Sequence, residues 1–247
     1  TYTALEAKDV RNDMNSLALG PWVHAQMYGD GSTLGAIPLD ADSSLFFREK
    51  VLQAFWDQHL KGVTPKQAIP PVLAFETGAN EWRAYDAWPP ALSAPPTRLY
   101  LQPGGRLSFA APAGAKEDAC DEYVSDPAKP VPYRVRPIRP MLPWEDYATW
   151  RLWLTYDQRP FSDRPDVLTY VSDILQEPLT IRGPVAATLY ASTTGTDSDW
   201  VVKLIDLYPG QVPAHPALGG YQLMISADIL RGRYRESFET AQPIPPG

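Results

Sequence analysis

Residues 199–209, DWVVKLIDLYP, and residues 219–236, GGYQLMISADILRGRYRE, indicate most clearly how this chain folds. Both runs are rich in β-branched and aromatic residues, and Gly, Pro and Asp residues break the chain around them, as is typical of strands. Within the first run, Lys203 and Asp206 interrupt opposite faces of an otherwise apolar strand. A strand with two mostly apolar faces is expected inside a sandwich, where both faces are covered.

Similar short runs recur between the middle of the chain and this stretch. Residues 72–78, VLAFETG, predict a buried strand, and residues 98–109, RLYLQPGGRLSF, predict a hairpin around Pro103-Gly104-Gly105. Further strands are expected in ATWRLWLTY (148–156), DVLTYVS (166–172) and VAATLYAS (185–192). So many short strands, with few helices between them, predict a mainly β fold, a β-sandwich or jelly roll.

The first part of the chain has a different pattern. Residues 15–19, NSLAL, predict a short strand that stops at a Gly-Pro pair. Residues 42–61 predict a helix, because their apolar residues recur at helical spacing. Asp42 or Ser43 can cap the start of this helix, and Gly62 can end it.

The change of pattern beyond this helix predicts two domains, residues 1–68 and residues 69–247. Hydrophobic residues make up 44% of the chain and charged residues 21%, as in ordinary globular proteins. No apolar run approaches the roughly 20 residues that span a bilayer, so no membrane partner is expected. The net charge is −7 and no Lys/Arg cluster is present, which argues against a nucleic-acid partner.

Metal and thiol chemistry are not expected. Cys120 is the single cysteine, so an intrachain disulfide is impossible. It lies among four carboxylates in EDACDEY, an environment that disfavours a nucleophilic thiolate. Asp197 and Asp199 could bind a cation through alternate carboxylates, although turn formation is the commoner role of such residues. We therefore predict neither a metal nor a cofactor.

His24, in GPWVHAQ (20–26), is the candidate catalytic residue. A histidine after a strand and a sharp Gly-Pro turn is well placed for a general base, and the alternative is a loop histidine bonded to backbone. A serine nucleophile needs an elbow such as G-x-S-x-G, and none is present. The serine-containing runs GDGSTLG (29–35) and ASTTGTDSDW (191–200) are interpreted as loops.

Other candidates have structural interpretations. His59 lies near the C-terminus of the predicted helix, where a cation is mildly favourable, and His215 is expected to be exposed between two prolines. The Trp-rich runs EWRAYDAWPP (81–90) and PWEDYATWRLW (143–153) could stack on sugars or on a hydrophobic substrate, or pack in a core or between domains.

Several runs in a characteristic order resemble one known family. They are LALGPWVHA (17–25), FWDQHLKG (55–62), PPVLAFETGANEWR (70–83), RLYLQPGGRLSF (98–109), YVSDPAKPVPY (123–133), the continuous run 157–209 and RGRYRESFE (231–239). The chain resembles the α-amino-acid ester hydrolases, which are related to glutaryl acylases, cocaine esterase and X-Pro dipeptidyl-peptidases. The resemblance covers essentially the whole chain.

The resemblance implies the C-terminal strand and helix of an α/β-hydrolase domain, followed by a jelly-roll β-sandwich that is incomplete at its C-terminal end. The histidine of GPW-x-H is the catalytic base of this family, and that role carries over to His24. The serine and the aspartate of the family's triad precede this histidine and have no counterpart here. The resemblance thus implies an upstream hydrolase segment as partner, a homo-oligomer, and a periplasmic or secreted location.

We accordingly predict part of a serine hydrolase that acts on small-molecule esters or amides of α-amino acids, with the 247 residues alone inactive. The sequence does not choose among ester hydrolase, glutaryl acylase and dipeptidyl-peptidase. The alternative is a non-catalytic jelly-roll module that binds carbohydrate, with Trp82, Trp88 or Trp144 as its platform, or that serves oligomer assembly.

Overall fold

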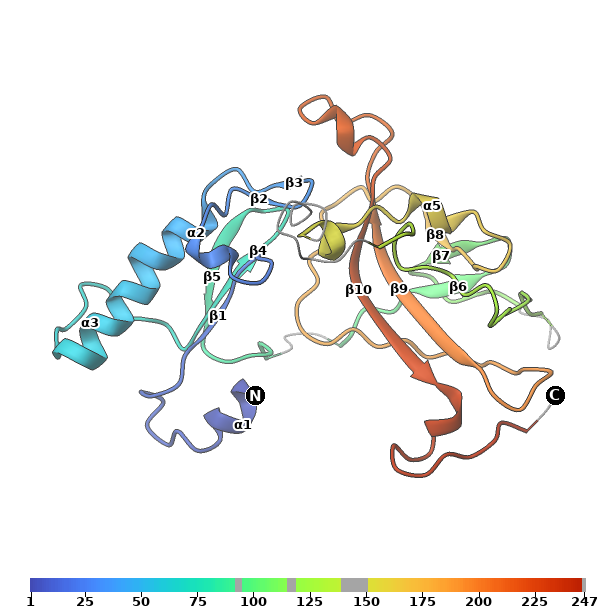
Figure 1. Cartoon of the computed structure of the whole chain (residues 1–247), viewed down its shortest axis with the longest axis horizontal. Helices are drawn as coiled ribbons and strands as arrows, with labels where there is room; N and C mark the ends of the chain where they lie inside the picture. The colour runs from blue at the N-terminus through green and yellow to red at the C-terminus, as the bar shows by residue number, and fades with distance from the viewer. Residues whose placement is uncertain (92–94, 115–118, 139–150, 246–247) are drawn as a thin grey trace. The chain divides into compact units, whose positions relative to one another are not determined.

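The chain forms two compact units. The computed structural model describes residues 1–91, 95–114, 119–138 and 151–245. The first unit contains residues 1–155 and 160–183, and the second contains residues 156–159 and 184–247. Ten strands in four sheets lie within the described residues, and the helices are few and mostly short (Figure 1). The expected mainly β composition is therefore confirmed.

A three-stranded sheet organises the N-terminal part of the first unit. It contains β1 (Leu17–Leu19), β4 (Val72–Glu76) and β5 (Glu81–Tyr85), in the order β1-β4-β5. β1 runs parallel to β4, and β4 runs antiparallel to β5. The side chains of Val72 and Ala74 are buried, which confirms the buried strand predicted at 72–78. β1 confirms the short strand predicted within 15–19.

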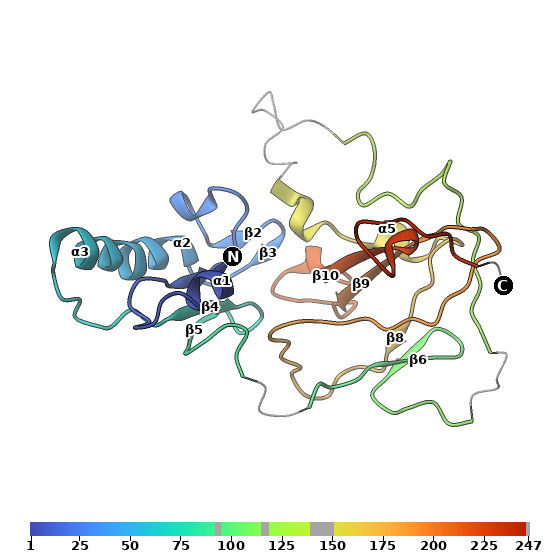
Figure 2. The ribbon, with the colours of Figure 1, turned by 90° about the horizontal axis from the view of Figure 1, so that it is seen from below.

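One continuous helix lies beside this sheet (Figure 2). It begins as α2 (Ser43–Phe46), continues through the π-helical segment η2 (Phe47–Leu52) and ends as α3 (Gln53–Lys61). At its start, the carboxylate of Asp42 accepts a hydrogen bond from the backbone N–H of Leu45 at 2.9 Å. At its end, Gly62 adopts the left-handed conformation with φ 67°. The predicted helix and both of its caps are confirmed.

Aromatic side chains connect the helix to the sheet. Trp82 of β5 stacks on Phe46 with ring centroids 5.6 Å apart and meets the ring of Phe75 edge-on at 5.4 Å. Trp22, in the loop that follows β1, lies 4.9 Å from Phe47 and 5.8 Å from Trp82. These five rings, here called the aromatic cluster, fix the loop after β1 against both the helix and the sheet.

The remaining elements of the first unit are short. α1 (Tyr2–Glu6) precedes β1, and the hairpin of β2 (Thr33–Leu34) and β3 (Ile37–Pro38) lies between β1 and the helix. After β5 come β6 (Tyr100–Gln102), β7 (Arg106–Ser108) and β8 (Val171–Ser172), which form a second three-stranded sheet in the order β6-β7-β8. β6 and β7 are antiparallel and confirm the hairpin predicted at 98–109. No helix in the described part of the chain is long and apolar enough to cross a lipid bilayer.

Three predicted strands differ from the structure. Within 148–156, residues 148–150 lie outside the described residues, and Leu152–Thr155 forms the 3₁₀ helix η4, followed by α5 (Arg159–Ser162). Of the run 166–172, only β8 pairs, and residues 185–192 adopt no strand. Short apolar runs carry no periodicity that separates a strand from a helical turn, so the prediction at 148–156 was wrong.

A long antiparallel ribbon forms the centre of the second unit. It pairs β9 (Asp199–Leu207) with β10 (Gln222–Arg231), and its register shifts between Met224 and Ser226. The 3₁₀ helices η5 (Pro216–Leu218) and η6 (Gly232–Tyr234) flank β10. This ribbon confirms the two strands that the sequence indicated most clearly.

Candidate active site

His24 lies in the turn Val23–Gln26, directly after the Gly20-Pro21 pair that ends β1. The chain can turn here because Gly20 lacks a Cβ, which would lie 2.4 Å from the ring of Trp22. The sequence predicted a histidine after a strand and a sharp turn, and this placement is confirmed. The side chain of His24 is exposed.

The turn has an unusual backbone. The N–H of Gln26 donates to the carbonyl of Val23 at 3.0 Å, so that His24 and Ala25 are its two central residues. Ala25 has φ 64° and ψ 3°, in the left-handed region that residues other than glycine seldom adopt. Val23 is 3% exposed and Gln26 is 6% exposed, whereas the two central residues are exposed. The turn therefore presents His24 outward from two buried ends.

The side chain of Gln26 ties this turn to the rest of the loop. Its Oε1 accepts a hydrogen bond from the N–H of Val23 at 3.1 Å. Its Nε2 donates to the carbonyl of Asp30 at 3.1 Å and to the carbonyl of Thr33 at 2.7 Å. One buried amide thus contacts the chain on both sides of the loop that carries His24, and its hydrogen-bonding groups are satisfied.

The first residues of the helix form hydrogen bonds to the same loop. Ser43 and Ser44 are 1% and 0% exposed. The indole N–H of Trp22 donates to Ser43 Oγ at 3.0 Å, and Ser43 Oγ donates to the carbonyl of Gly31 at 2.8 Å. Ser44 Oγ donates to the carbonyl of Gln26 at 3.1 Å. The approach requires glycine at position 31, where a Cβ would lie 2.2 Å from Ser44 Oγ.

Asp42 completes this support. Its Oδ1 accepts from the N–H of Leu45 and from the N–H of Gly31, both at 2.9 Å. Burial opposes its charge, but these backbone hydrogen bonds and the nearby Arg48 outweigh burial and hold the pKa of Asp42 below its usual value. A carboxylate at the start of a helix is also favoured by the helix dipole.

The other two histidines lie where the sequence predicted. His59 is exposed on α3, and its ring packs on Phe55 with centroids 4.4 Å apart. His215 is exposed, as expected, at the start of η5. Neither residue belongs to the hydrogen-bonded loop around His24.

The two carboxylates considered for a cation pair with arginines instead. Arg233 donates to Asp197, and Arg231 Nε lies 3.5 Å from Asp199. Within the described residues, no group of three or more His, Cys, Asp or Glu side chains could hold a metal ion. Cys120 is exposed beside Glu122, with 3.7 Å between the sulfur and a carboxylate oxygen.

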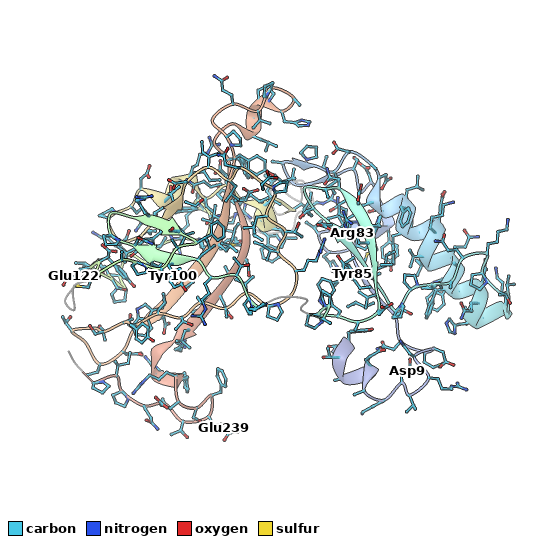
Figure 3. The ribbon with its side chains drawn as sticks, turned by 180° about the vertical axis from the view of Figure 1, so that it is seen from behind. Asp9, Arg83, Tyr85, Tyr100, Glu122 and Glu239 are labelled. Atoms are coloured by element: carbon cyan, nitrogen blue, oxygen red, sulfur yellow. The ribbon has the colours of Figure 1, made fainter. Side chains whose placement is uncertain are left out.

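Two of the three tryptophans considered as a sugar platform take part in packing. Trp82 is half-buried in the aromatic cluster, and Trp88 is half-buried with its ring edge-on to Tyr85 at 5.6 Å. Arg83 and Tyr85 lie on the same strand, β5 (Figure 3). Trp144 lies outside the described residues. The positions of Trp82 and Trp88 favour the packing interpretation.

Two clefts lie between α3 and the chain around β1. The larger has a volume of about 420 Å³ and is lined by residues that include Asp13, Phe55 and His59. The smaller, of about 180 Å³, is apolar and lined by residues that include Leu17, Phe55 and Trp56. His24 lines neither cleft.

Sequence reasoning missed two residues of this site. Ala25 gave no signal, because a left-handed conformation is expected at glycine or asparagine rather than alanine. Gln26 lies two residues after His24 in the sequence. Its role was missed because it depends on the carbonyl of Thr33, which lies within hydrogen-bonding distance only in the folded loop.

Comparison with known proteins identifies a family for most of the chain. Residues 66–247 match the family described as the X-Pro dipeptidyl-peptidase C-terminal non-catalytic domain. Cocaine esterase from Rhodococcus sp. (strain MB1 Bresler) is 30% identical over 233 residues, which are 90% of this chain and 36% of that enzyme.

Two solved structures are similar over nearly the whole chain. An aminopeptidase from a marine sediment Thaumarchaeota archaeon is 49% identical with a TM-score of 0.91, over 99% of this chain and 39% of that one. An α-amino acid ester hydrolase is 45% identical with a TM-score of 0.88, over 100% of this chain and 40% of that one. The chain thus spans about two fifths of the length of these relatives. It belongs to the family of X-Pro dipeptidyl-peptidase C-terminal non-catalytic domains.

Proposed function

We propose that this chain is the C-terminal part of a serine hydrolase that acts on esters or amides of α-amino acids, with His24 as general base. The observation that carries the proposal is the position of His24. It is exposed on a strained turn at the end of β1, and it lies ahead of the non-catalytic match at 66–247. Yet it lies within a chain that is covered almost completely by the match to two hydrolases.

The division of the chain into two roles follows from the same comparison. We propose that residues 1–68 complete an α/β-hydrolase domain and that residues 69–247 form a jelly-roll sandwich. Residues 1–68 contain β1 and the continuous helix of α2, η2 and α3, which are the strand and the helix expected of this part, and this supports the first assignment. The antiparallel pairs β6–β7 and β9–β10 support the second.

The proposed mechanism is acyl transfer through a serine ester. His24 would accept the proton of a serine hydroxyl as that oxygen attacks the substrate carbonyl, and would return the proton to the leaving alcohol or amine. An aspartate would hold the other ring nitrogen of the imidazole in the correct tautomer. In this proposal, the serine and the aspartate come from polypeptide outside these 247 residues.

A direct test uses the complete gene product that contains this sequence. His24→Ala should lower kcat for an α-amino-acid methyl ester by at least roughly 10³-fold, because a triad without its base keeps only binding and oxyanion stabilisation. His215→Ala is the matched control and should keep wild-type kcat. Equal rates for His24→Ala and wild type would refute the assignment of the base. Parallel assays with a glutaryl amide and an X-Pro anilide would identify the substrate class.

The same proposal makes an expectation about the 247 residues alone. The purified chain should not hydrolyse p-nitrophenyl acetate above the buffer rate, since its general base has no serine elbow to activate. Turnover that disappears in His24→Ala would show instead that these 247 residues contain a complete catalytic site.

A further inference from the structure

We propose that Gln26 is a positioning residue for His24: its buried amide holds the turn Val23–Gln26 in its strained form and so determines where the imidazole stands. This inference rests on the proposed function of His24 as general base. It assigns a role in catalysis to a residue whose side chain bonds to the backbone of Val23, Asp30 and Thr33.

The argument begins with the backbone of Ala25. A left-handed alanine is disfavoured, so it persists only where the surrounding structure holds it, and such residues gather at functional sites. A four-residue turn can exchange its form by rotating its central peptide group. Here that group joins His24 to Ala25. Rotation would therefore move the backbone from which the imidazole projects.

The side chain of Gln26 opposes this rotation from inside the loop. It accepts the N–H of Val23, the residue directly before His24, and its amide group donates to the carbonyls of Asp30 and Thr33 on the returning chain. Because it is 6% exposed, water cannot readily replace these contacts. The side chain of Gln26 thereby connects both ends of the turn, Val23 and Gln26, to the backbone of Asp30 and Thr33.

The helix fixes the same ends a second time. Ser44 Oγ donates to the carbonyl of Gln26, and the indole of Trp22 donates to Ser43. Trp22, Val23 and Gln26 are thus packed or hydrogen-bonded, and only the two central residues of the turn are exposed. A catalytic side chain held by buried, satisfied neighbours is the arrangement that a pre-organised base requires.

The test compares three variants of the complete gene product. Gln26→Met keeps the length of the side chain and removes all three hydrogen bonds. We expect kcat to fall by about 10- to 100-fold while KM stays within about twofold, because a misplaced base weakens the chemical step and leaves substrate binding intact. Gln26→Asn keeps a buried amide that is one methylene too short for all three partners, and its kcat should fall between wild type and Gln26→Met.

Gln158→Met is the matched control. Gln158 is also a buried glutamine, 2% exposed, and its side chain donates to the carbonyl of Tyr156 and accepts from Lys203. Its substitution should cost similar stability without changing kcat. Equal losses of kcat in Gln26→Met and Gln158→Met would overturn the proposal, since general destabilisation would then explain both.

A spectroscopic measurement on the 247-residue chain reads the turn directly. A positive φ at Ala25 gives a short intraresidue HN–Hα distance and hence a strong cross-peak in a nuclear Overhauser spectrum. This signal should weaken in Gln26→Met and persist in Gln158→Met. If Gln26→Met fails to fold by circular dichroism, Gln26→Asn decides the question in both assays.

The outcomes separate this inference from the proposed function. If His24→Ala keeps full activity, the assignment of His24 as general base fails, and the proposed role of Gln26 in catalysis fails with it, whatever the spectrum shows. If His24→Ala is inactive while the Gln26 variants keep wild-type kcat, the role of Gln26 alone is refuted.

Discussion

At the scale of single residues, Asp157 shows how one carboxylate can fasten a strand. Its Oδ2 accepts from Arg159 Nε at 2.6 Å, and its Oδ1 accepts from the N–H groups of Arg159 and Gln222 at 3.1 and 3.3 Å. Burial opposes the charge of Asp157, but these hydrogen bonds and the arginine outweigh it and hold its pKa below the usual value. The start of β10 is thereby tied to residues 156–159.

This carboxylate should make stability depend on pH. Between the lowered pKa of the folded state and the value of about 3.9 in the unfolded state, the unfolded chain binds more protons. The stabilisation is therefore present above that unfolded value and is lost as the pH falls through the folded pKa. We expect Asp157→Asn to lower the free energy of unfolding by about 1–2 kcal/mol at pH 7.

Urea titrations of wild type and Asp157→Asn at pH 7 and at pH 2.5 would measure this difference. The gap between the two proteins should shrink at the acidic pH. Asp228→Asn, at an exposed position on β10, is the control and should match wild type within about 0.5 kcal/mol. An equally large gap at both pH values would contradict the expected role of the charge.

At the scale of elements, the helix between Asp42 and Gly62 shows what the sequence can predict. Its caps and its periodicity are local signals, and all of them reappear in the structure. The π-helical segment Phe47–Leu52 within it was not predicted, because a widened turn leaves no local mark in composition.

The start of this helix gives a prediction for an element. Asp42→Ala should lower the free energy of unfolding by about 1–2 kcal/mol, because the N–H groups of Leu45 and Gly31 lose their acceptor. Asp42→Asn keeps an oxygen at that position and should lose only a few tenths of a kcal/mol. Thermal unfolding followed by circular dichroism would rank the variants. Similar melting temperatures for Asp42→Ala and wild type would contradict the role of the cap.

Strands, like the helix, were predicted where their signals are local in the sequence. The hairpin 98–109 and the ribbon of β9 and β10 were predicted because turn residues and β-branched runs are local signals. The apolar run around Leu152–Thr155 became a 3₁₀ helix, since the choice depends on tertiary context. The candidate site divides in the same way: His24 follows from its neighbours in sequence, and Gln26 requires the folded loop.

At the scale of the whole molecule, the long ribbon of the second unit carries exposed apolar side chains. Val201 and Ile229 lie opposite each other on the ribbon and are 55% and 61% exposed. Exposed apolar area of this kind marks surfaces that other polypeptide covers.

The 247-residue chain should therefore bind the dye ANS and self-associate when studied alone. We expect a clear rise in dye fluorescence, and light scattering after gel filtration should give a mass of at least a dimer. Ile229→Thr should reduce the fluorescence without changing the far-ultraviolet circular dichroism spectrum. A monomer that leaves the dye dark would contradict this expectation.

The second unit includes residues 156–159, which are separated in sequence from the rest of that unit, residues 184–247, by 24 residues. These four residues supply Asp157 to β10, Gln158 to the lysine of β9 and Arg159 to the carbonyl of Gly219. A fragment that begins at residue 184 would lack residues 156–159, and the ribbon would lose these hydrogen bonds. An expression fragment of the second unit should therefore begin at residue 156 and include residues 160–183.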